Sequence, residues 1–256
     1  MKTTINRSTY ALAVVAGSHA ELTLYGNIYR NRPIDWDTGA PAKGNFIVLD
    51  EFLEDLKEIE GCRTLTIRMD SYGGDAYVSN TIHNRLRELQ RGGMSITCIV
   101  DGVAMSGGSL IMCACDTVEV NPSSLIMIHD CWVFMFGGYN SAELRKTAED
   151  LDSVNKMQAA IYARKTGLEK TEILAMMAET TYMTGEEAVE KGFADKLLDE
   201  AEPLDIAASA DRRTLYVRNR SYHLAPGMTA PAALKTAEPP GAWASRMLEK
   251  FKQKEE

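Results

Sequence analysis

Three motifs of the chain place reactive groups directly after apolar segments. Ser106 lies in the segment VAMSGGS (103–109), Gly73 and Gly74 follow a second apolar segment, and His129 closes a third, LIMIH. A serine hydroxyl beside an imidazole can attack a carbonyl carbon, because the imidazole takes the hydroxyl proton. Backbone N–H groups at a glycine turn or a helix start can stabilise the oxyanion that forms. The three motifs therefore indicate the parts of a serine hydrolase site.

Each motif alone carries less weight than the three together. A serine before a helix often caps that helix, and a histidine in an apolar strand usually packs in the core. His19, His83 and His223 lie before the first expected core strand, inside an expected helix and in the C-terminal region, respectively. Because only His129 closes a strand at the edge where Ser106 is expected, His129 is the candidate base.

In their order along the chain, the motifs resemble those of the ClpP family of serine peptidases, most closely the ClpP-related proteases of bacteriophages and prophages. The resemblance extends from about Glu21 to Asp199 and is carried by the segments SYGG (71–74), GVAMS (102–106), PSSLIMIH (122–129) and TGEEAVEKGFAD (184–195). It implies an α/β fold of the ClpP/crotonase type, a superhelix of strand–helix repeats with a long projecting helix. It also implies polypeptide substrates, a homo-oligomeric ring and no cofactor.

The resemblance assigns roles to individual residues. Ser106 matches the family's nucleophile and His129 its general base. The backbone N–H groups of Gly74 and Gly107 match its oxyanion hole, which stabilises the negative charge on the attacked carbonyl oxygen.

The third catalytic position departs from the family pattern. The family has an acid, usually Asp, where this chain has Thr180. A threonine hydroxyl can accept a hydrogen bond from the imidazole, but it does not stabilise imidazolium as a carboxylate does. Glu179 is the alternative third member, and a Ser–His pair without a third member is also open. Asp101 and Asp130 adjoin motif residues, but successive strand residues point to opposite faces, so we do not expect either one to serve.

The resemblance to phage and prophage proteases also suggests the biological process in which the protein acts. It implies head maturation by cleavage of scaffold or capsid precursors, with capsid, scaffold or portal proteins as partners. The sequence leaves open whether an AAA+ ATPase feeds the enzyme. Two alternatives also stay open: a catalytically impaired structural or adaptor oligomer, because Thr180 stands where the family has an acid, and a crotonase-type acyl-CoA enzyme, because crotonases share the superhelix.

The composition is that of an ordinary globular chain. Of the 256 residues, 45% are hydrophobic and 25% are charged, and the net charge is −8. The negative charge argues against nucleic-acid binding, and no apolar run reaches the ~18 residues of a membrane span. We expect a cytoplasmic protein with five reduced cysteines, and no metal at the pair Cys113 and Cys115, because no second pair has ligand spacing. The apolar segment 10–17 resembles a secretory signal, but it is short.

Apolar periodicity and turn residues predict the following elements: strands at 21–29, 64–69, 95–100, 116–120 and 125–129, helices at 50–60, from the Gly74 turn to about 90, and after Ser106, and a loop at 31–45. A capping box of Thr184 and Glu187 predicts a further helix that ends at Gly192. Strands that alternate with helices favour a parallel sheet.

The longest expected helix covers 141–166. Asn140 and Glu143 form a capping box at its start, and Gly167 ends it. Its apolar stripe fits two arrangements equally well: packing on its own domain, or projection toward another ring.

We divide the chain into an N-terminal extension (1–20), a ClpP-like peptidase domain (21–200) and a C-terminal extension (201–256). Within the last part we expect a strand at 214–217, a flexible linker at 225–240 and a final amphipathic helix at 242–256, which could dock on a partner.

Overall fold

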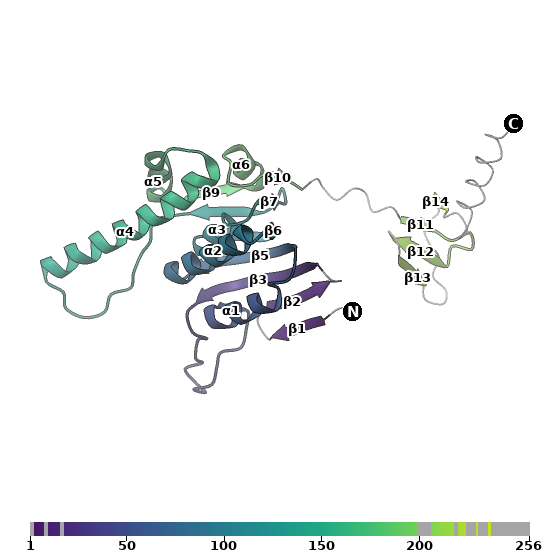
Figure 1. Cartoon of the computed structure of the whole chain (residues 1–256), viewed down its shortest axis with the longest axis horizontal. Helices are drawn as coiled ribbons and strands as arrows, with labels where there is room; N and C mark the ends of the chain where they lie inside the picture. Colours follow the sequence, from purple (N-terminus) through teal and green to yellow (C-terminus); the bar gives the residue numbers. More distant parts are fainter. Residues whose placement is uncertain are drawn as a thin grey trace. The chain divides into compact units, whose positions relative to one another are not determined.

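The computed structural model describes residues 3–7, 10–15, 18–198, 206–217, 220–223, 229 and 235–236. The chain divides into two compact units, residues 1–198 and residues 199–256 (Figure 1). All candidate catalytic residues belong to the first unit.

The first unit alternates strands and helices along the sequence. Its strands are β1 (Thr3–Arg7), β2 (Tyr10–Val15), β3 (His19–Tyr29), β4 (Phe46–Val48), β5 (Thr64–Gly74), β6 (Ser95–Met105), β7 (Thr117–Val120), β8 (Leu125–Ile128), β9 (Thr181–Thr184) and β10 (Lys196–Leu197). Its helices are α1 (Leu49–Glu58), α2 (Ala76–Arg91), α3 (Gly107–Met112), α4 (Ser141–Thr166), α5 (Lys170–Ala178) and α6 (Gly185–Glu190).

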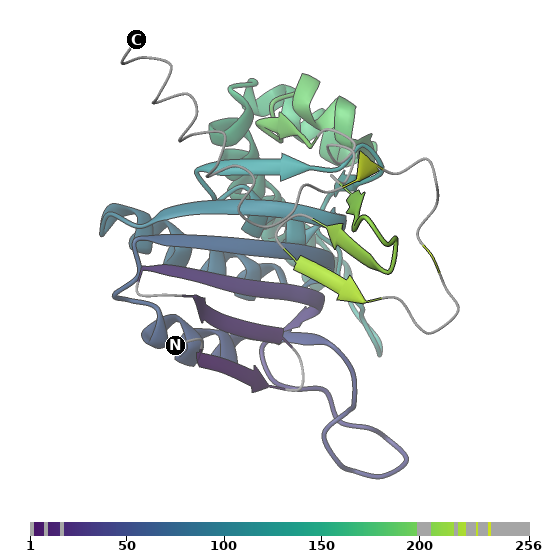
Figure 2. The same cartoon turned by 90° about the vertical axis from the view of Figure 1, so that its right-hand side faces the viewer.

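One mixed sheet forms the frame of this unit. Its strands follow the order β1-β2-β3-β5-β6-β7-β10, and they lie side by side in Figure 2 with helices behind them. The pairs from β3 to β10 are parallel, whereas β1 and β2 pair antiparallel. The predicted α/β fold with parallel strands is therefore confirmed.

Strand β6 has two partners along one edge. Its residues Thr97–Val100 pair with β7, and its residues Val103–Met105 pair with β8, which in turn pairs antiparallel with β9. The sheet forks at this point, because the end of β6 leaves β7 and continues along β8. Both Ser106 and His129 follow directly after the strands of this second pairing.

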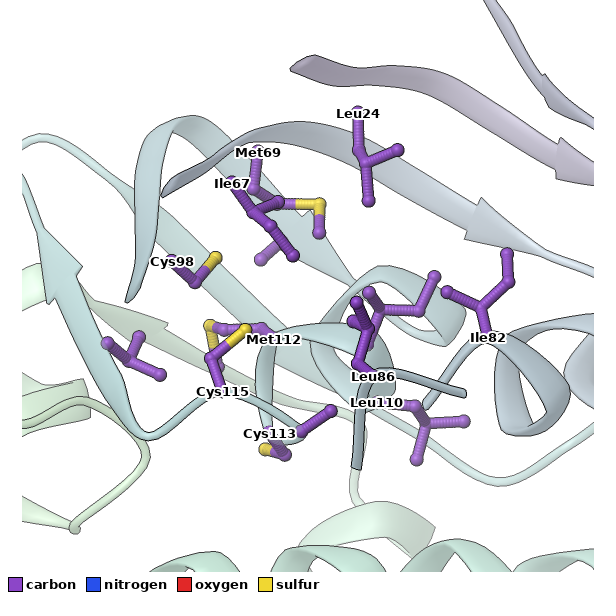
Figure 3. Close-up of a cluster of buried hydrophobic side chains, with 14 of the residues drawn as sticks. Leu24, Ile67, Met69, Ile82, Leu86, Cys98, Leu110, Met112, Cys113 and Cys115 are labelled. Atoms are coloured by element: carbon purple, nitrogen blue, oxygen red, sulfur yellow. The ribbon is translucent and has the colours of Figure 1, made fainter. Parts of the chain in front are cut away.

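The core lies between the sheet and the helices. Every second residue of the central strands is buried, as expected for a sheet with one covered face. Figure 3 shows Ile67, Met69 and Cys98 of the sheet facing Leu86 of α2 and Met112 of α3.

The cysteines of this unit are all free thiols. Cys98, Cys113 and Cys115 are buried among apolar side chains, and Cys62 and Cys131 are partly buried. Among the residues that the structure describes, no three His, Cys, Asp or Glu side chains gather as a metal site would require.

Helix α4 has two halves with different surroundings. The predicted capping box of Asn140 and Glu143 is present, and Gly167 ends the helix in the left-handed conformation. The first half projects from the sheet, and Leu144 there is 49% exposed (Figure 1). From Val154 onward the helix packs on α3 and α5. The helix therefore both packs on its own domain and projects. Within the described ranges, no helix is long and apolar enough to cross a bilayer.

Strands β5 and β6 extend further than the sequence predicts. They end at Gly74 and Met105, rather than at Met69 and Val100. A register shift after Met69 interrupts the pairing, and the two strands then pair again. Gly102 permits this shift, because a Cβ there would lie 2.7 Å from the Asp70 carboxylate, which accepts the Val103 N–H.

The segment expected to be an N-terminal extension contributes strands to the main sheet. Strand β2 pairs antiparallel with β3, and β1 pairs with β2. The apolar segment at 10–17, which resembled a short secretory signal, contains strand β2, which pairs with β1 on one side and with β3 on the other.

The second unit contains a four-stranded sheet of order β13-β12-β11-β14. The strands are β11 (Ile206–Ala208), β12 (Thr214–Val217), β13 (Arg220–His223) and β14 (Lys235–Thr236). The predicted strand at 214–217 is confirmed. The predicted linker at 225–240 is wrong at Lys235–Thr236, because these residues pair with β11. The rest of that linker, except residue 229, and the expected helix at 242–256 lie outside the described residues.

His83 is a buried histidine that ties three helices together. It lies on α2, its Nδ1 is 2.8 Å from the Leu110 carbonyl oxygen of α3, and its Nε2 is 2.6 Å from Nη2 of Arg164 on α4. Burial lowers the pKa of His83 to about 4, the bond to the Leu110 carbonyl partly opposes this, and the Arg164 charge lowers the pKa further. The folded protein therefore holds this imidazole neutral.

The lowered pKa predicts an acid-sensitive fold. The unfolded chain protonates His83 near its ordinary pKa of about 6.5, so the stability that depends on the neutral ring is complete above that pH and is lost as the pH falls toward about 4. Between about pH 7 and about pH 5, we expect the wild type to lose about 2 kcal/mol more than His83→Gln, which has no proton to gain. Urea unfolding at the two pH values measures the difference; equal losses would contradict the prediction.

Candidate active site

The backbone of Ser106 is held in an unusual conformation between β6 and α3. Its φ is 52° and its ψ is −120°, a region that a non-glycine residue enters at a cost in strain. Its N–H donates to the Met127 carbonyl of β8 at 2.8 Å, and its carbonyl accepts from Ser109 Oγ at 2.7 Å and from the Tyr162 hydroxyl at 3.3 Å. Fixed at both backbone polar groups, Ser106 presents its side chain to the groove beside it.

The side chains of Ser106 and His129 are in contact. His129 Nε2 lies 2.8 Å from Ser106 Oγ, which is hydrogen-bond distance for a nucleophile and its base. Burial lowers the pKa of His129, and the neighbouring Asp130 charge partly opposes this. Near neutral pH the imidazole is therefore unprotonated and able to accept the serine proton.

The glycine turn at the end of β5 packs against the serine. A Cβ on Gly73 would lie 2.7 Å from the Met105 carbonyl oxygen and 2.8 Å from both Ser106 Cβ and the Gly107 nitrogen. Gly73 also has a φ of 92°. Only a glycine allows so close an approach, and the approach brings the end of β5 against the nucleophile turn at Met105, Ser106 and Gly107.

Thr180 is the expected third member of the site, but the structure gives its side chain no hydrogen bond to His129. Ile128 pairs with Thr181 at the end of the β8–β9 pairing, so His129 follows one of these paired residues and Thr180 precedes the other. The Thr180 N–H donates to the Met177 carbonyl. Within the described part of the chain, the hydrogen bond of the His129 ring is with Ser106. Thr180 and Glu179 are both exposed, and the φ of Thr180 is 53°.

The two aspartates that sequence reasoning set aside have other contacts. Asp101 pairs with Arg68 and accepts from the Tyr25 hydroxyl at 2.7 Å, so its carboxylate is engaged away from the imidazole. Asp130 donates its backbone N–H to the Met177 carbonyl and acts on His129 through its charge.

A groove of about 860 Å³ passes over the serine and the histidine. Tyr72, Tyr77 and Trp132 border it, and each of these side chains is at least 60% exposed.

Helix α4 contributes site residues that sequence reasoning missed. Asn155 Oδ1 accepts the Cys131 N–H at 2.7 Å, and Tyr162 contacts the Ser106 carbonyl. Gln158, between them on the helix, lines the groove. A signal was present in the sequence, because these polar side chains interrupt the apolar stripe of the helix at spacings of three and four residues.

Comparisons with known proteins agree with this geometry. A family model described as Clp protease matches residues 18–201. Among solved structures, the chain is similar to a point mutant of ClpP1 from Listeria monocytogenes, with a TM-score of 0.55 and 17% sequence identity. The match covers 71% of this chain and 92% of that one, and at this identity it shows a common fold. No curated protein sequence matches the chain.

Because Gly73 lies so close to the nucleophile turn, we expect one added methyl group at this position to reduce activity strongly. Gly73→Ala must displace the Met105 carbonyl or the Gly107 nitrogen, and it places alanine at a φ of 92°. We expect a loss of peptidase activity of roughly a hundredfold or more, as when one oxyanion donor is removed. Gly61→Ala is the control, because a Cβ there meets nothing within 4 Å. Equal activity of the two variants would contradict the assignment.

Proposed function

Because the chain belongs to the Clp protease family, we propose that it is a serine endopeptidase with Ser106 as nucleophile and His129 as general base. The observation that carries this proposal is the 2.8 Å contact between Ser106 Oγ and His129 Nε2 beside the Gly73 turn. The ClpP-type fold around the two residues supports it.

The reaction follows from this contact. Ser106 Oγ attacks the scissile carbonyl carbon while His129 Nε2 takes the hydroxyl proton, which gives a tetrahedral intermediate and an imidazolium. The imidazolium returns the proton to the departing amine, and the C–N bond breaks to leave an acyl-enzyme. Water then attacks the ester in the same way and releases the carboxylate product.

The N–H groups of Gly74 and Gly107 are the proposed oxyanion donors. The Ser106 N–H already donates to Met127, so it is engaged. The Gly107 N–H is the first of α3, where helix geometry leaves the backbone donors without intrahelical partners. One such donor is worth roughly 3 kcal/mol to the transition state.

A labelling experiment tests the proposed nucleophile. A fluorophosphonate probe should react with the wild type at Ser106, and Ser106→Ala should abolish both labelling and cleavage of unfolded casein. His129→Ala should slow labelling by roughly 10²- to 10⁴-fold, the usual contribution of a general base. Ser95→Ala, at an exposed position at the start of β6, is the control. A folded protein that the probe leaves unlabelled would overturn the proposal.

We propose Thr180 as the residue that orients His129, with Glu179 as the alternative. The proposal favours Thr180 over Glu179 because Thr180 directly precedes Thr181, the residue that pairs with Ile128 just before His129. Without a carboxylate there, the imidazolium formed during catalysis is less stabilised, and the maximal rate should be low. Activity should appear as the pH rises through the lowered pKa of His129.

Replacing Thr180 by aspartate tests this assignment. Thr180→Asp should raise the plateau rate at least about tenfold, because its charge stabilises the imidazolium. The same charge raises the pKa of His129, so the acid limb of the pH–rate profile should move to higher pH. Thr180→Asn is the matched control, because asparagine also tolerates the positive φ but adds no charge. If Thr180→Asp changes neither quantity while Glu179→Gln abolishes turnover, Glu179 is the orienting residue.

The absence of a carboxylate on His129, within the described residues, favours a second candidate, a catalytically impaired oligomer with a structural or adaptor role. The two candidates differ in one measurement. Turnover of casein that depends on Ser106 excludes the impaired form.

The wider role we propose is that of a homo-oligomeric ring that processes capsid or scaffold precursors of a phage. The exposed Trp132, Phe134 and Phe136 and the projecting half of α4 support an assembly, because an isolated subunit would leave them in water. Light scattering at micromolar concentration measures the assembly. The resemblance of the catalytic motifs to those of phage proteases supports a role in cleaving capsid or scaffold precursors. A capsid or portal gene beside this one would strengthen the proposal.

A further inference from the structure

The α4 wall of the groove contains a nearly buried glutamine, Gln158, whose carboxamide has no hydrogen-bond partner among the described residues. Gln158 is 5% exposed and lines the groove beside Ser106 and His129. Its side chain makes no hydrogen bond to any described residue. Its buried neighbours differ, because Asn155 binds the Cys131 N–H and Ser109 binds the Ser106 carbonyl and the Tyr162 hydroxyl.

An unpartnered carboxamide in such a place needs an explanation. Its NH₂ can donate two hydrogen bonds and its oxygen can accept two, and leaving them unmade in a buried position costs free energy. The described residues have no fully enclosed, unpaired oxygen or nitrogen at Gln158, so its polar end keeps contact with the groove. Water in the groove can reach this end, and a polar group of a bound peptide can take the place of that water.

The helix fixes where this carboxamide lies. Asn155, three residues earlier, contacts the backbone two residues after His129, and Tyr162, four residues later, contacts the Ser106 carbonyl. Residues at these spacings share one face of a helix. Gln158 therefore faces the space between the serine and the segment that follows the histidine, within the groove that holds Ser106.

The side chains around Gln158 indicate which kind of substrate side chain could bind there. Met127 and Val154 supply apolar wall to the groove. We propose that Gln158 is a specificity-determining residue that hydrogen-bonds the terminal carboxamide of a glutamine at P1, the residue whose carbonyl is attacked, while Met127 and Val154 contact its methylene groups. This inference rests on the proposed peptidase function.

Glutamine and methionine have nearly the same shape, and exchanging one for the other, at P1 of the peptide and at position 158 of the enzyme, tests the inference. Fluorogenic peptides of one sequence and one coumarin leaving group are compared with glutamine or methionine at P1, so that only P1 varies. The wild type should prefer P1 glutamine by roughly tenfold in kcat/KM, the effect of one or two hydrogen bonds. Gln158→Met should remove this preference, because the thioether keeps the shape and loses the hydrogen bonds. Leu151→Met, also on the α4 wall, is the control and should keep it.

The outcomes separate this inference from the function on which it rests. Labelling of Ser106 with equal cleavage of both peptides by the wild type overturns the role of Gln158 and leaves the peptidase intact. A Gln158→Met variant that slows both peptides equally and shifts the pH profile also overturns it, in favour of positioning His129. An enzyme that neither reacts with the probe nor cleaves peptide removes both proposals. If Gln158→Met does not fold, Gln158→Glu should shift the preference toward P1 lysine, and an unchanged profile overturns the inference.

Discussion

The pairing of β8 with the end of β6 is the constraint on which the site depends. It directs the Met127 carbonyl at the Ser106 N–H and holds the serine at a φ of 52°. The same pairing ends one strand at Met105 and the other at Ile128, so the two following side chains meet. A strained nucleophile persists only where its surroundings over-determine the backbone, and here β8, α3 and α4 all contribute.

Close contacts from β5 and α4 further fix the backbone around Ser106 and His129. Gly73 of β5 lies close to the backbone of the nucleophile turn, and Tyr162 of α4 contacts the Ser106 carbonyl, so a strand and a helix both hold the serine. Helix α4 also fixes the segment after His129 through Asn155. The second half of this one helix thus contacts the backbone at Ser106 and near His129, the two candidate catalytic residues.

The chemistry of the site differs from that of a complete triad in one respect. Burial lowers the pKa of His129, and the charge that acts on it comes from Asp130 rather than from a hydrogen-bonded carboxylate. Such a base is available at mildly acidic pH, but it gains little help when it becomes charged. A slow peptidase with a narrow set of substrates would tolerate this, and a polar specificity pocket at Gln158 fits such an enzyme.

Much of this protein was determined by local sequence. The Asn140 and Glu143 capping box, Gly167 and the apolar alternation of the strands act over a few residues, so helix α4, the parallel sheet and the three motifs could be predicted. The lengths of β5 and β6, the strands before residue 18 and the strand at Lys235–Thr236 could not, because pairing with distant strands decides them. The contact of Tyr162 with Ser106 and the exposure of Gln158 to the groove likewise join residues about 50 positions apart. Periodicity shows which side chains are buried, but only tertiary packing decides what they touch.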